Sequence, residues 1–458
     1  MSAWFPRVTL HSLVVALSVL IYVLTTRVEH ERRPPSIAIA WVLGMIAVPY
    51  FVLPMYILFG RRKLPRRVLQ WCGSRAHGEH WAEDLIEGFG LAPPSPSAVR
   101  MHQDGGESAA ALFATMSSAG QRLDICTYIL GDDAFGREAM QRMMERARCG
   151  VQVRLLIDGV GAMQLPRPCF KRLNAAGVDT AIFSPLWARK TQGPRNLRNH
   201  RKMAIADGAH LWAGGRNIAA EYFTGVKGAR PWLDLTFDLQ GTVAAAAASQ
   251  FEADWVAAGG RPAAGDFGAA QASLQQQRST GGLAQFLPSG PDQAEDTVHA
   301  LLIDACFHVR DRMLAVTPYF VPDASLETAM RLAARRGVQI DLCIPAVSNH
   351  RLADFARNRA LRALGNAGVN IHLLPYMMHG KAVVFDQSLA VSGSVNLDSR
   401  SLLLNYECAV VFYGAREIEW LANWIQSLIP EARPFDARAP SLWRDIGEGL
   451  LLTVAYQL

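Results

Sequence analysis

Two long apolar runs open the chain, at residues 8–26 and 37–59. Each run is close to the ~20 residues with which a helix spans a hydrocarbon core of about 30 Å. The alternative for the first run is a cleavable signal peptide. A membrane hairpin is favoured, because the run is long, no small-x-small cleavage site follows it and a second run comes soon after. We therefore expect residues 1–67 to form a two-helix transmembrane hairpin and a basic juxtamembrane segment.

Basic side chains flank these runs unequally. The connector at residues 27–35 holds three arginines, whereas residues 61–67 hold five basic side chains and Arg7 precedes the first run. The positive-inside bias therefore places both termini in the cytoplasm and the connector outside. Seven cysteines without a CxxC pair agree with a reducing compartment.

After the apolar runs, the two halves of the chain repeat one order of blocks. Residues 123–159 and 313–346 each contain a short β-rich run, a helical stretch closed by glycine and a second apolar strand. The closing glycines are Gly150 and Gly337. Strand–helix–strand repetition of this kind predicts two α/β sandwiches.

The duplication sets the expected domains. We place the first lobe at residues 68–256 and the second at residues 286–458. Between them, residues 257–285 are rich in Ala, Gly and Gln, which is typical of a flexible linker or a surface loop. Duplicated units commonly build one site where equivalent surfaces meet, so we expect a single active site shared by both lobes.

Each half carries one H-x-K-x4-D pattern. The candidate catalytic residues are His200, Lys202 and Asp207 in the first half and His379, Lys381 and Asp386 in the second. One such match would be weak evidence, but two at equivalent places in a repeat are strong. Side chains two positions apart on a strand point to the same face, so each lysine accompanies its histidine. The aspartates close the strands, and we expect them to be structural hydrogen-bond acceptors more than catalysts.

These triplets resemble the HKD motifs of the phospholipase D superfamily. Residues 214–217 resemble the glycine–asparagine turn of its bacterial cardiolipin synthase branch, and residues 393–401 and 405–407 resemble the second motif of that branch. The paired N-terminal runs agree, and the resemblance covers nearly the whole chain. It implies two duplicated phospholipase D-type α/β/α lobes that share one active site at the bacterial inner (cytoplasmic) membrane, on its cytoplasmic side.

The resemblance also implies a mechanism. A neutral imidazole attacks phosphorus to give a phosphohistidine, and a second, protonated imidazole gives its proton to the departing alcohol. Family precedent assigns the attack to His200 and the acid–base work to His379, although the near symmetry of the motifs leaves the reverse open. The sequence contains no carboxylate cluster or His/Cys ligand set, so we expect neither a metal nor another cofactor.

Further residues are expected at the site. The side chains expected to hold the phosphoryl oxygens are Lys202, Lys381, Asn217, Asn396 and Ser394. Each histidine also needs an acceptor that fixes its tautomer. Glu407 follows the second motif where the superfamily has its orienting carboxylate, and Asp234 is the expected equivalent for His200. An ordinary exposed acid is the alternative reading of both.

Charge bears on the partners. The formal net charge is +6, which favours anionic partners. A basic stretch precedes the first motif, and it predicts either a solvated loop or a collar that gathers lipid headgroups. Its members are Arg189, Lys190, Arg195, Arg198 and Arg201. Nucleic acid is not expected, because the basic residues cluster near the membrane segment and one loop instead of along a groove. The sequence leaves the oligomeric state open.

These features favour transfer of a phosphatidyl group from one phosphatidylglycerol to another, which yields cardiolipin and glycerol. Two membrane runs would keep the catalytic unit at the bilayer, where a lipid acceptor outcompetes water by local concentration. A phospholipase D hydrolase or a different phosphatidyl transferase is the close alternative. A membrane-tethered nuclease is the alternative from another class, since HKD chemistry also cleaves nucleic-acid phosphodiesters.

Overall fold

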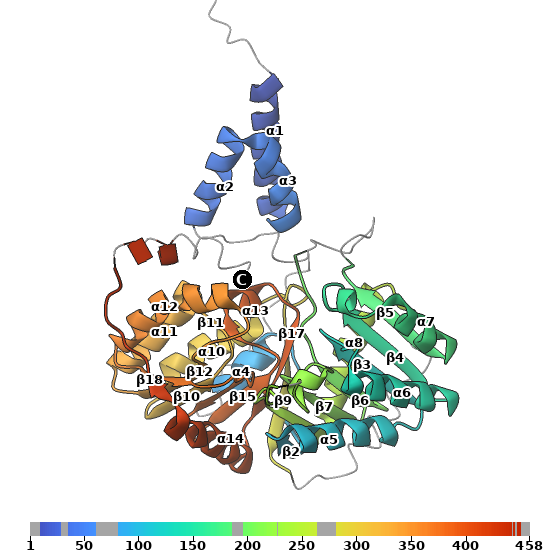
Figure 1. The fold of residues 1–458 in the computed structure, drawn as a ribbon. Coiled ribbons are helices and arrows are strands. Elements are labelled where there is room, and N and C mark those ends of the chain that lie inside the picture. The colour runs from blue at the N-terminus through green and yellow to red at the C-terminus, as the bar shows by residue number, and fades with distance from the viewer. Residues whose placement is uncertain are drawn as a thin grey trace, which may run out of the picture.

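The structure is a computed structural model that describes residues 10–28, 35–60, 81–185, 196–226, 228–262, 281–441, 443–444 and 447–449. Several sequence-based expectations concern residues outside these ranges. They are the basic segment 61–67, residues 263–280 of the expected linker, and Arg189, Lys190 and Arg195. Within the described ranges, two α/β lobes lie beside one another, and a group of N-terminal helices projects from one side of them (Figure 1).

The N-terminal apolar runs form three helices where two were expected: α1 (Leu10–Val28), α2 (Pro35–Ala47) and α3 (Pro49–Phe59). The second run breaks at Val48, whose backbone has φ −141° and ψ 62°. Pro49 then opens α3, because a proline lacks the N–H group and fits the first helical turn. Across the part of the chain that the structure describes, no helix is both long enough and apolar enough to cross a membrane.

The first lobe is built on a seven-stranded sheet with the order β2-β8-β7-β6-β3-β4-β5. Its strands are β2 (Ala98–His102), β3 (Arg122–Thr127), β4 (Gln152–Asp158), β5 (Val178–Phe183), β6 (Met203–Ala206), β7 (His210–Gly214) and β8 (Thr236–Gln240). The pairs β3–β4 and β4–β5 are parallel, and the other pairs are antiparallel. One face packs on α5 (Gly105–Ser118), α6 (Ala134–Arg148) and α7 (Arg167–Ala175), and the other on α8 (Thr242–Ala257).

The second lobe repeats this sheet strand for strand, in the order β9-β17-β15-β14-β10-β12-β13. Its strands are β9 (Leu283–Ser289), β10 (Arg312–Val316), β12 (Gln339–Pro345), β13 (Asn370–Leu374), β14 (Ala382–Phe385), β15 (Leu389–Gly393) and β17 (Glu407–Phe412). Its parallel pairs, β10–β12 and β12–β13, correspond to those of the first lobe. The predicted duplication is therefore confirmed.

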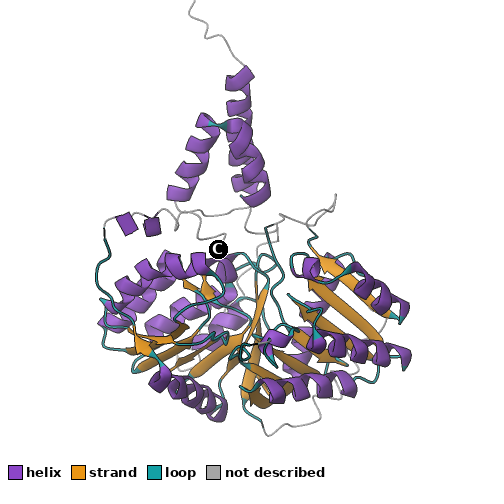
Figure 2. Cartoon of the chain, viewed as in Figure 1, coloured by secondary structure: helices purple, strands orange, loops and turns teal. Residues whose placement is uncertain are grey.

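Helices again cover both faces of the second sheet (Figure 2). One face packs on α10 (Thr297–His308), α11 (Ala324–Arg335) and α12 (Arg351–Gly365), and the other on α14 (Ala415–Leu428). Short strands β1 (Ser95–Pro96) and β18 (Arg433–Pro434) extend the sheet at its two edges. A separate pair, β11 (Phe320–Val321) and β16 (Leu397–Asp398), precedes the short helix α13 (Ser399–Leu403).

The start of the expected first lobe packs on the second lobe instead. Helix α4 (Trp81–Gly88) buries Ala82 and Ile86 in the core of the second lobe, and the Trp81 ring stacks on His308 with centroids 4.4 Å apart. Strand β1 pairs with β9. The expectation that residues 81–96 belong to the first lobe is therefore wrong. An apolar stripe on a helix shows that the helix is packed, but it does not name the sheet that it covers.

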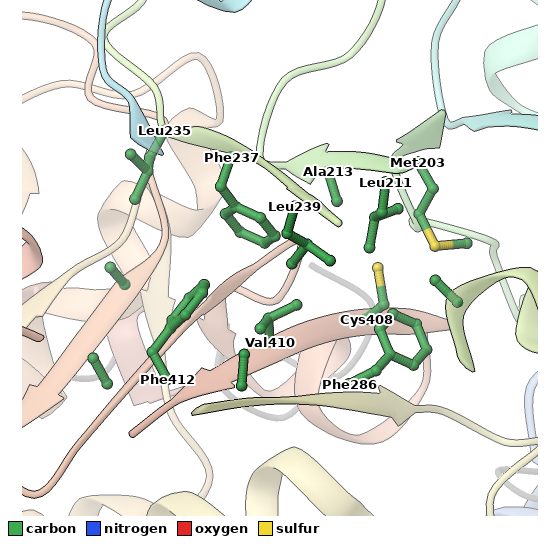
Figure 3. Close-up of a cluster of buried hydrophobic side chains, with 14 of the residues drawn as sticks. Met203, Leu211, Ala213, Leu235, Phe237, Leu239, Phe286, Cys408, Val410 and Phe412 are labelled. Atoms are coloured by element: carbon green, nitrogen blue, oxygen red, sulfur yellow. The ribbon is translucent and has the colours of Figure 1, made fainter. Parts of the chain in front are cut away.

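A shared core joins the lobes. Buried side chains of α8 and α14 and of the facing sheet surfaces form one continuous cluster. Within it, Phe237 of β8 meets Phe412 of β17 edge to face, with ring centroids 5.4 Å apart, and Met203, Phe286 and Cys408 lie nearby (Figure 3). Because such packing fixes one lobe against the other, side chains contributed by both can form a precise site.

Candidate active site

The first histidine lies just before β6, where the chain is held by the second lobe. The His200 N–H donates to the Tyr406 carbonyl (2.8 Å), and the Tyr406 N–H donates to the Arg198 carbonyl (2.9 Å). The Nδ1 atom of His200 lies 2.9 and 3.1 Å from the two carboxylate oxygens of Glu407. Glu407 is the first residue of β17, so an acid of the second lobe orients the histidine of the first.

The second histidine is held in the mirrored way. The His379 N–H donates to the Leu233 carbonyl (2.6 Å), and the Leu233 N–H donates to the Met377 carbonyl (3.1 Å). The Nδ1 atom of His379 lies 2.6 Å from Oδ2 of Asp234, which stands two residues before β8 in the first lobe. A carboxylate only accepts, so in both histidines Nδ1 carries the proton and Nε2 keeps the lone pair.

Both carboxylates lie within hydrogen-bond distance of a histidine, but the expected pairing of Asp234 with His200 is wrong. Asp234 was expected beside His200, and it lies on His379 instead. The cause is that the loop before each histidine pairs with the opposite lobe, through bridges at Asn199–Tyr406 and Leu233–Met378. Sequence order could not show this exchange.

Glycine-containing turns let the acid-bearing strands approach. A Cβ atom on Gly215 would lie 2.1 Å from Oδ1 of Asp234, and one on Gly393 would lie 2.2 Å from the carbonyl oxygen of Cys408. Any side chain at either position would push the carboxylate strand away. The glycines of the two motifs therefore allow the segments that carry Asp234 and Glu407 to lie close to the motif turns.

Both lysines fold back onto their own histidines. Lys202 Nζ donates to the His200 carbonyl (2.7 Å), and Lys381 Nζ lies 2.9 Å from Nδ1 of His379. Burial disfavours the charged form and lowers the pKa of Lys202 to about 7 and that of Lys381 to about 8. The nearby carboxylates raise both pKa values, but by less than burial lowers them. An anion bound beside either lysine would therefore raise its pKa and stabilise the charged ammonium form.

The two half-sites share one electrostatic environment. Burial lowers the pKa of His200 and takes that of His379 to about 3. Lys381 further lowers the pKa of His200, and Lys202 that of His379. Burial would raise the pKa of Asp234, but His379 and Lys381 outweigh it, so that carboxyl ends below its ordinary pKa. Charges from both lobes thus act on one centre.

Aromatic rings wall the site, and sequence reasoning did not single them out. The Tyr128 ring centroid lies 5.1 Å from that of His200. Around His379, the ring centroids of Tyr222, Trp232 and Tyr319 lie at 5.1, 5.5 and 6.3 Å. The repeat carries a signal for two of them, since Tyr128 and Tyr319 both follow the first strand of their repeat unit.

Both motif aspartates accept backbone hydrogen bonds at the ends of their strands. The Asp207 carboxylate accepts the backbone N–H groups of Gly120, Gln121 and Arg122 at 2.7–2.8 Å. The Asp386 carboxylate does the same for residues 310–312 at 2.8–2.9 Å. Both aspartates have positive φ, 53° and 50°, and each lies at the end of its strand away from the histidine. Each aspartate thus joins the end of its own strand to the start of the antiparallel neighbour in the sheet, β3 in the first lobe and β10 in the second.

The predicted phosphoryl donors are engaged within the protein. The Asn217 amide donates to the Tyr222 hydroxyl (2.7 Å), and the Asn396 amide donates to the Ser401 hydroxyl (3.1 Å). The Ser394 hydroxyl donates a hydrogen bond to Glu407. The phosphoryl role of Asn217, Asn396 and Ser394 stays a prediction. Within the described ranges, no group of His, Cys, Asp and Glu could hold a metal ion.

Two members of the basic stretch, Arg198 and Arg201, are buried, so for them neither a solvated loop nor a lipid collar is correct. Arg198 donates to the Ser184 carbonyl (2.8 Å) and pairs with Asp158. Arg201 donates to the Glu407 carbonyl (2.9 Å) and lies against two acids far along the chain, Asp254 and Asp292. The carboxylates that neutralise these arginines come from distant segments of the chain. The burial of the arginines could therefore not be predicted from the basic stretch alone.

Known proteins are similar to this chain in sequence. Residues 112–255 and 302–429 match the family described as "Cardiolipin synthase, PLD-like domain", and residues 14–61 match "Phospholipase D-nuclease N-terminal". Cardiolipin synthase A of Pseudomonas aeruginosa is 31% identical over 95% of this chain and 93% of its own length. The major cardiolipin synthase of Bacillus subtilis is 28% identical over 93% of each chain. The chain therefore belongs to the cardiolipin synthase family of phospholipase D-like proteins.

Solved structures share the duplicated fold. A phosphatidylserine synthase of Haemophilus influenzae aligns with a TM-score of 0.62 over 83% of this chain and 100% of its own, at 12% identity. A polyphosphate kinase of Porphyromonas gingivalis aligns with a TM-score of 0.52 over 92% of this chain and 64% of its own, at 13% identity. At these identities, the likeness concerns the fold alone.

Proposed function

We propose that this protein is a cardiolipin synthase-like phosphatidyltransferase, which moves a phosphatidyl group from one phosphatidylglycerol to another and releases glycerol. The observation that carries the proposal is the crossed pair of His–carboxylate contacts, His200–Glu407 and His379–Asp234, flanked by two lysines. Relatives named cardiolipin synthase match nearly the whole chain, which supports the choice of substrate.

In the first half-reaction, Nε2 of His200 attacks the phosphorus of phosphatidylglycerol. The P–O bond to the glycerol headgroup breaks, and the departing oxygen takes a proton from Nε2 of His379. Glycerol leaves, and the phosphatidyl group stays on His200. Lys202 and Lys381 offset the charge on the phosphoryl oxygens as it develops.

In the second half-reaction, a second phosphatidylglycerol supplies a hydroxyl group of its headgroup. That hydroxyl gives its proton to Nε2 of His379 while its oxygen attacks phosphorus. The P–N bond to His200 breaks, cardiolipin forms, and both histidines regain their starting states. The aromatic walls of the site favour this acceptor over water, because they leave little room for solvent around the phosphoryl group.

Protonation of His379 depends on the substrate. In the free site, burial holds the pKa of His379 at about 3, so its imidazole is neutral. The phosphodiester of phosphatidylglycerol brings a negative charge beside the ring, and an adjacent anion favours the protonated form. Substrate binding therefore raises the pKa of His379 and favours the protonated form that the first half-reaction uses.

The proposal includes attachment to the bacterial inner membrane by residues 1–67, with the lobes on the cytoplasmic side. More than half of the large apolar side chains that are exposed in the described part of the chain belong to residues 10–57, among them Leu10 and Phe51. Apolar surface on this scale needs a lipid or protein cover. The basic side chains at residues 61–67 support the cytoplasmic orientation.

The test is to incubate the purified full chain with phosphatidylglycerol in phosphatidylcholine vesicles and to identify the products by mass spectrometry. Cardiolipin and glycerol in equal amounts are the expected products. Phosphatidic acid without cardiolipin would show a hydrolase and overturn the proposal. His200→Ala should give neither product, whereas the matched control His372→Gln should keep activity, because His372 lies on β13, where it pairs with Asp341 of β12 and is outside the two motifs.

A further inference from the structure

A cavity opens on the second lobe, between helix α12 and the edge strand β18. Its volume is about 690 Å³, which lies in the range of small-molecule sites, about 300–1,000 Å³. Its described lining contains no residue of the catalytic motifs. The cavity is therefore a separate feature, which the proposed reaction does not use.

The lining of this cavity is basic. Four arginines face two aspartates, a formal net charge of 4 − 2 = +2. They are Arg351, Arg357, Arg433, Arg444, Asp354 and Asp436. Among the described residues, Arg351 and Arg433 are exposed and form no ion pair, whereas Arg444 pairs with Glu448. Two uncompensated guanidinium groups at one opening favour an anion.

One arginine is built into the wall. Arg357 is 4% exposed, and its Nη2 donates to the Ala346 carbonyl (2.9 Å). Its Nη1 forms an ion pair with Asp354, with 2.9 Å between the two atoms. Arg357 therefore neutralises Asp354 within the wall, and the two exposed arginines remain as the groups that can bind an anion in the cavity.

Apolar side chains surround the same opening. Val347 and Phe355 line the cavity, and they are 69% and 37% exposed. Leu352, three residues before Phe355 on α12, and Trp443, next to Arg444, are also exposed. Helix α12 lies on the side of the lobes from which α1, α2 and α3 project (Figure 1). Arginines beside exposed aliphatic and aromatic groups match the border between lipid headgroups and acyl chains.

We propose that this cavity binds the phosphate of an anionic phospholipid drawn from the bilayer surface. Arg351 and Arg433 bind the phosphate oxygens, and Val347 and Phe355 contact the glycerol backbone and the first acyl carbons. The apolar rim distinguishes this ligand from a free phosphate ion, which gains nothing from it. When a phospholipid of the bilayer is bound in this cavity, the second lobe is held against the membrane surface.

The test uses the full chain in detergent micelles with His200→Ala, so that no turnover occurs. Isothermal titration with dihexanoyl phosphatidic acid should show a site in addition to any binding at the catalytic centre, and the affinity of this site should fall by at least about tenfold in the double variant Arg351→Gln/Arg433→Gln. Both arginines are exposed, so their loss leaves the fold intact. Dihexanoyl phosphatidylcholine and inorganic phosphate should bind this site at least about tenfold more weakly.

The matched control is Arg310→Gln/Arg331→Gln, which removes the same charge from exposed positions of the same lobe outside the cavity. Its affinity for dihexanoyl phosphatidic acid should equal that of the parent. Three results would overturn the proposal: unchanged binding in the Arg351/Arg433 variant, equal loss in the control variant, or inorganic phosphate binding as tightly as the lipid.

The outcome is independent of the proposed reaction. Lipid binding in the His200→Ala background requires no product, and product formation is measured with the unsubstituted histidine. Failure of the cavity proposal would leave cardiolipin formation intact. Failure of the proposed function would leave the arginine-dependent binding intact.

Discussion

The two half-sites carry the same motif but offer their histidines different surroundings. The His200 side chain is 13% exposed and meets both oxygens of Glu407. The His379 side chain is 4% exposed, meets one oxygen of Asp234 and has three aromatic rings around it. The more open ring is the one that a lipid phosphate can reach for attack, and the enclosed ring suits proton transfer away from water. The asymmetry supports the assignment that the motifs alone left open.

The half-sites also depend on one another. Each lobe supplies a histidine and a lysine to its own half and a carboxylate to the opposite half. A single lobe would hold a histidine without its acceptor, and the tautomer that exposes Nε2 would not be fixed. The duplication therefore yields one site that needs both copies, instead of two independent sites.

The largest expected effect separates the roles of the histidines. His200→Ala should abolish turnover of phosphatidylglycerol and of phosphatidyl-p-nitrophenol, whose leaving group needs no proton. His379→Ala should lower the rate with phosphatidylglycerol by about 10²–10⁴-fold, yet still release one equivalent of p-nitrophenol in a burst. Burst amplitude and the intact mass of the phosphatidyl-enzyme measure this. A burst from the His200 variant but not from the His379 variant would reverse the roles.

The next effect tests the crossed carboxylates. Glu407→Gln and Asp234→Asn should each lower kcat by about 10–100-fold, because each histidine loses the group that orients it. Thermal unfolding of single and double variants gives the coupling free energy. His379→Ala should couple to Asp234→Asn by about 0.5–3 kcal/mol and more weakly to Glu407→Gln. Stronger coupling to Glu407 would show that the pairing is not crossed.

The lysines should set the alkaline side of the pH profile. Burial holds the pKa of Lys202 at about 7 and that of Lys381 at about 8. As pH rises through these values the ammonium groups lose their protons, so kcat/KM should fall. On the acid side, kcat/KM should persist below pH 6.5, because the pKa of His200 is lowered from that value.

Replacement by arginine checks this assignment. Lys202→Arg keeps the charge at all accessible pH values, so the alkaline limb should move up by about one pH unit, at a lower rate overall. The measurement is kcat/KM from about pH 5 to about pH 10. The control is Lys171→Arg on α7, outside the site, which should leave the profile unchanged. An unmoved alkaline limb in the Lys202 variant would assign it to another group.

The smallest expected effect on catalysis concerns the aspartates, where the two lobes are alike. Asp207→Ala and Asp386→Ala each remove an acceptor of three backbone N–H groups. Each should lower the free energy of unfolding by about 1–3 kcal/mol and leave kcat of the folded protein nearly unchanged. Urea unfolding and kcat at low temperature measure both. A large loss of kcat with unchanged stability would make these aspartates catalytic.

Short-range patterns in the sequence determined much of this protein. The repeated blocks predicted two α/β lobes, because strand and helix periodicities are local properties of the chain. The spacing H-x-K placed His200 with Lys202 and His379 with Lys381, since alternate residues of an extended chain share a face. The expectation for Asp207 and Asp386 rested on the same local geometry, and both carboxylates accept backbone N–H groups in the structure.

Tertiary structure decided what depends on distant segments. His200 and Glu407 are 207 positions apart, and their contact exists because the lobes pack through a shared core. The burial of Arg201 against Asp254 and Asp292 and the packing of α4 on the second lobe have the same origin. Local sequence fixes which face a side chain occupies, but only the packing of one lobe on the other fixes which side chain it meets there.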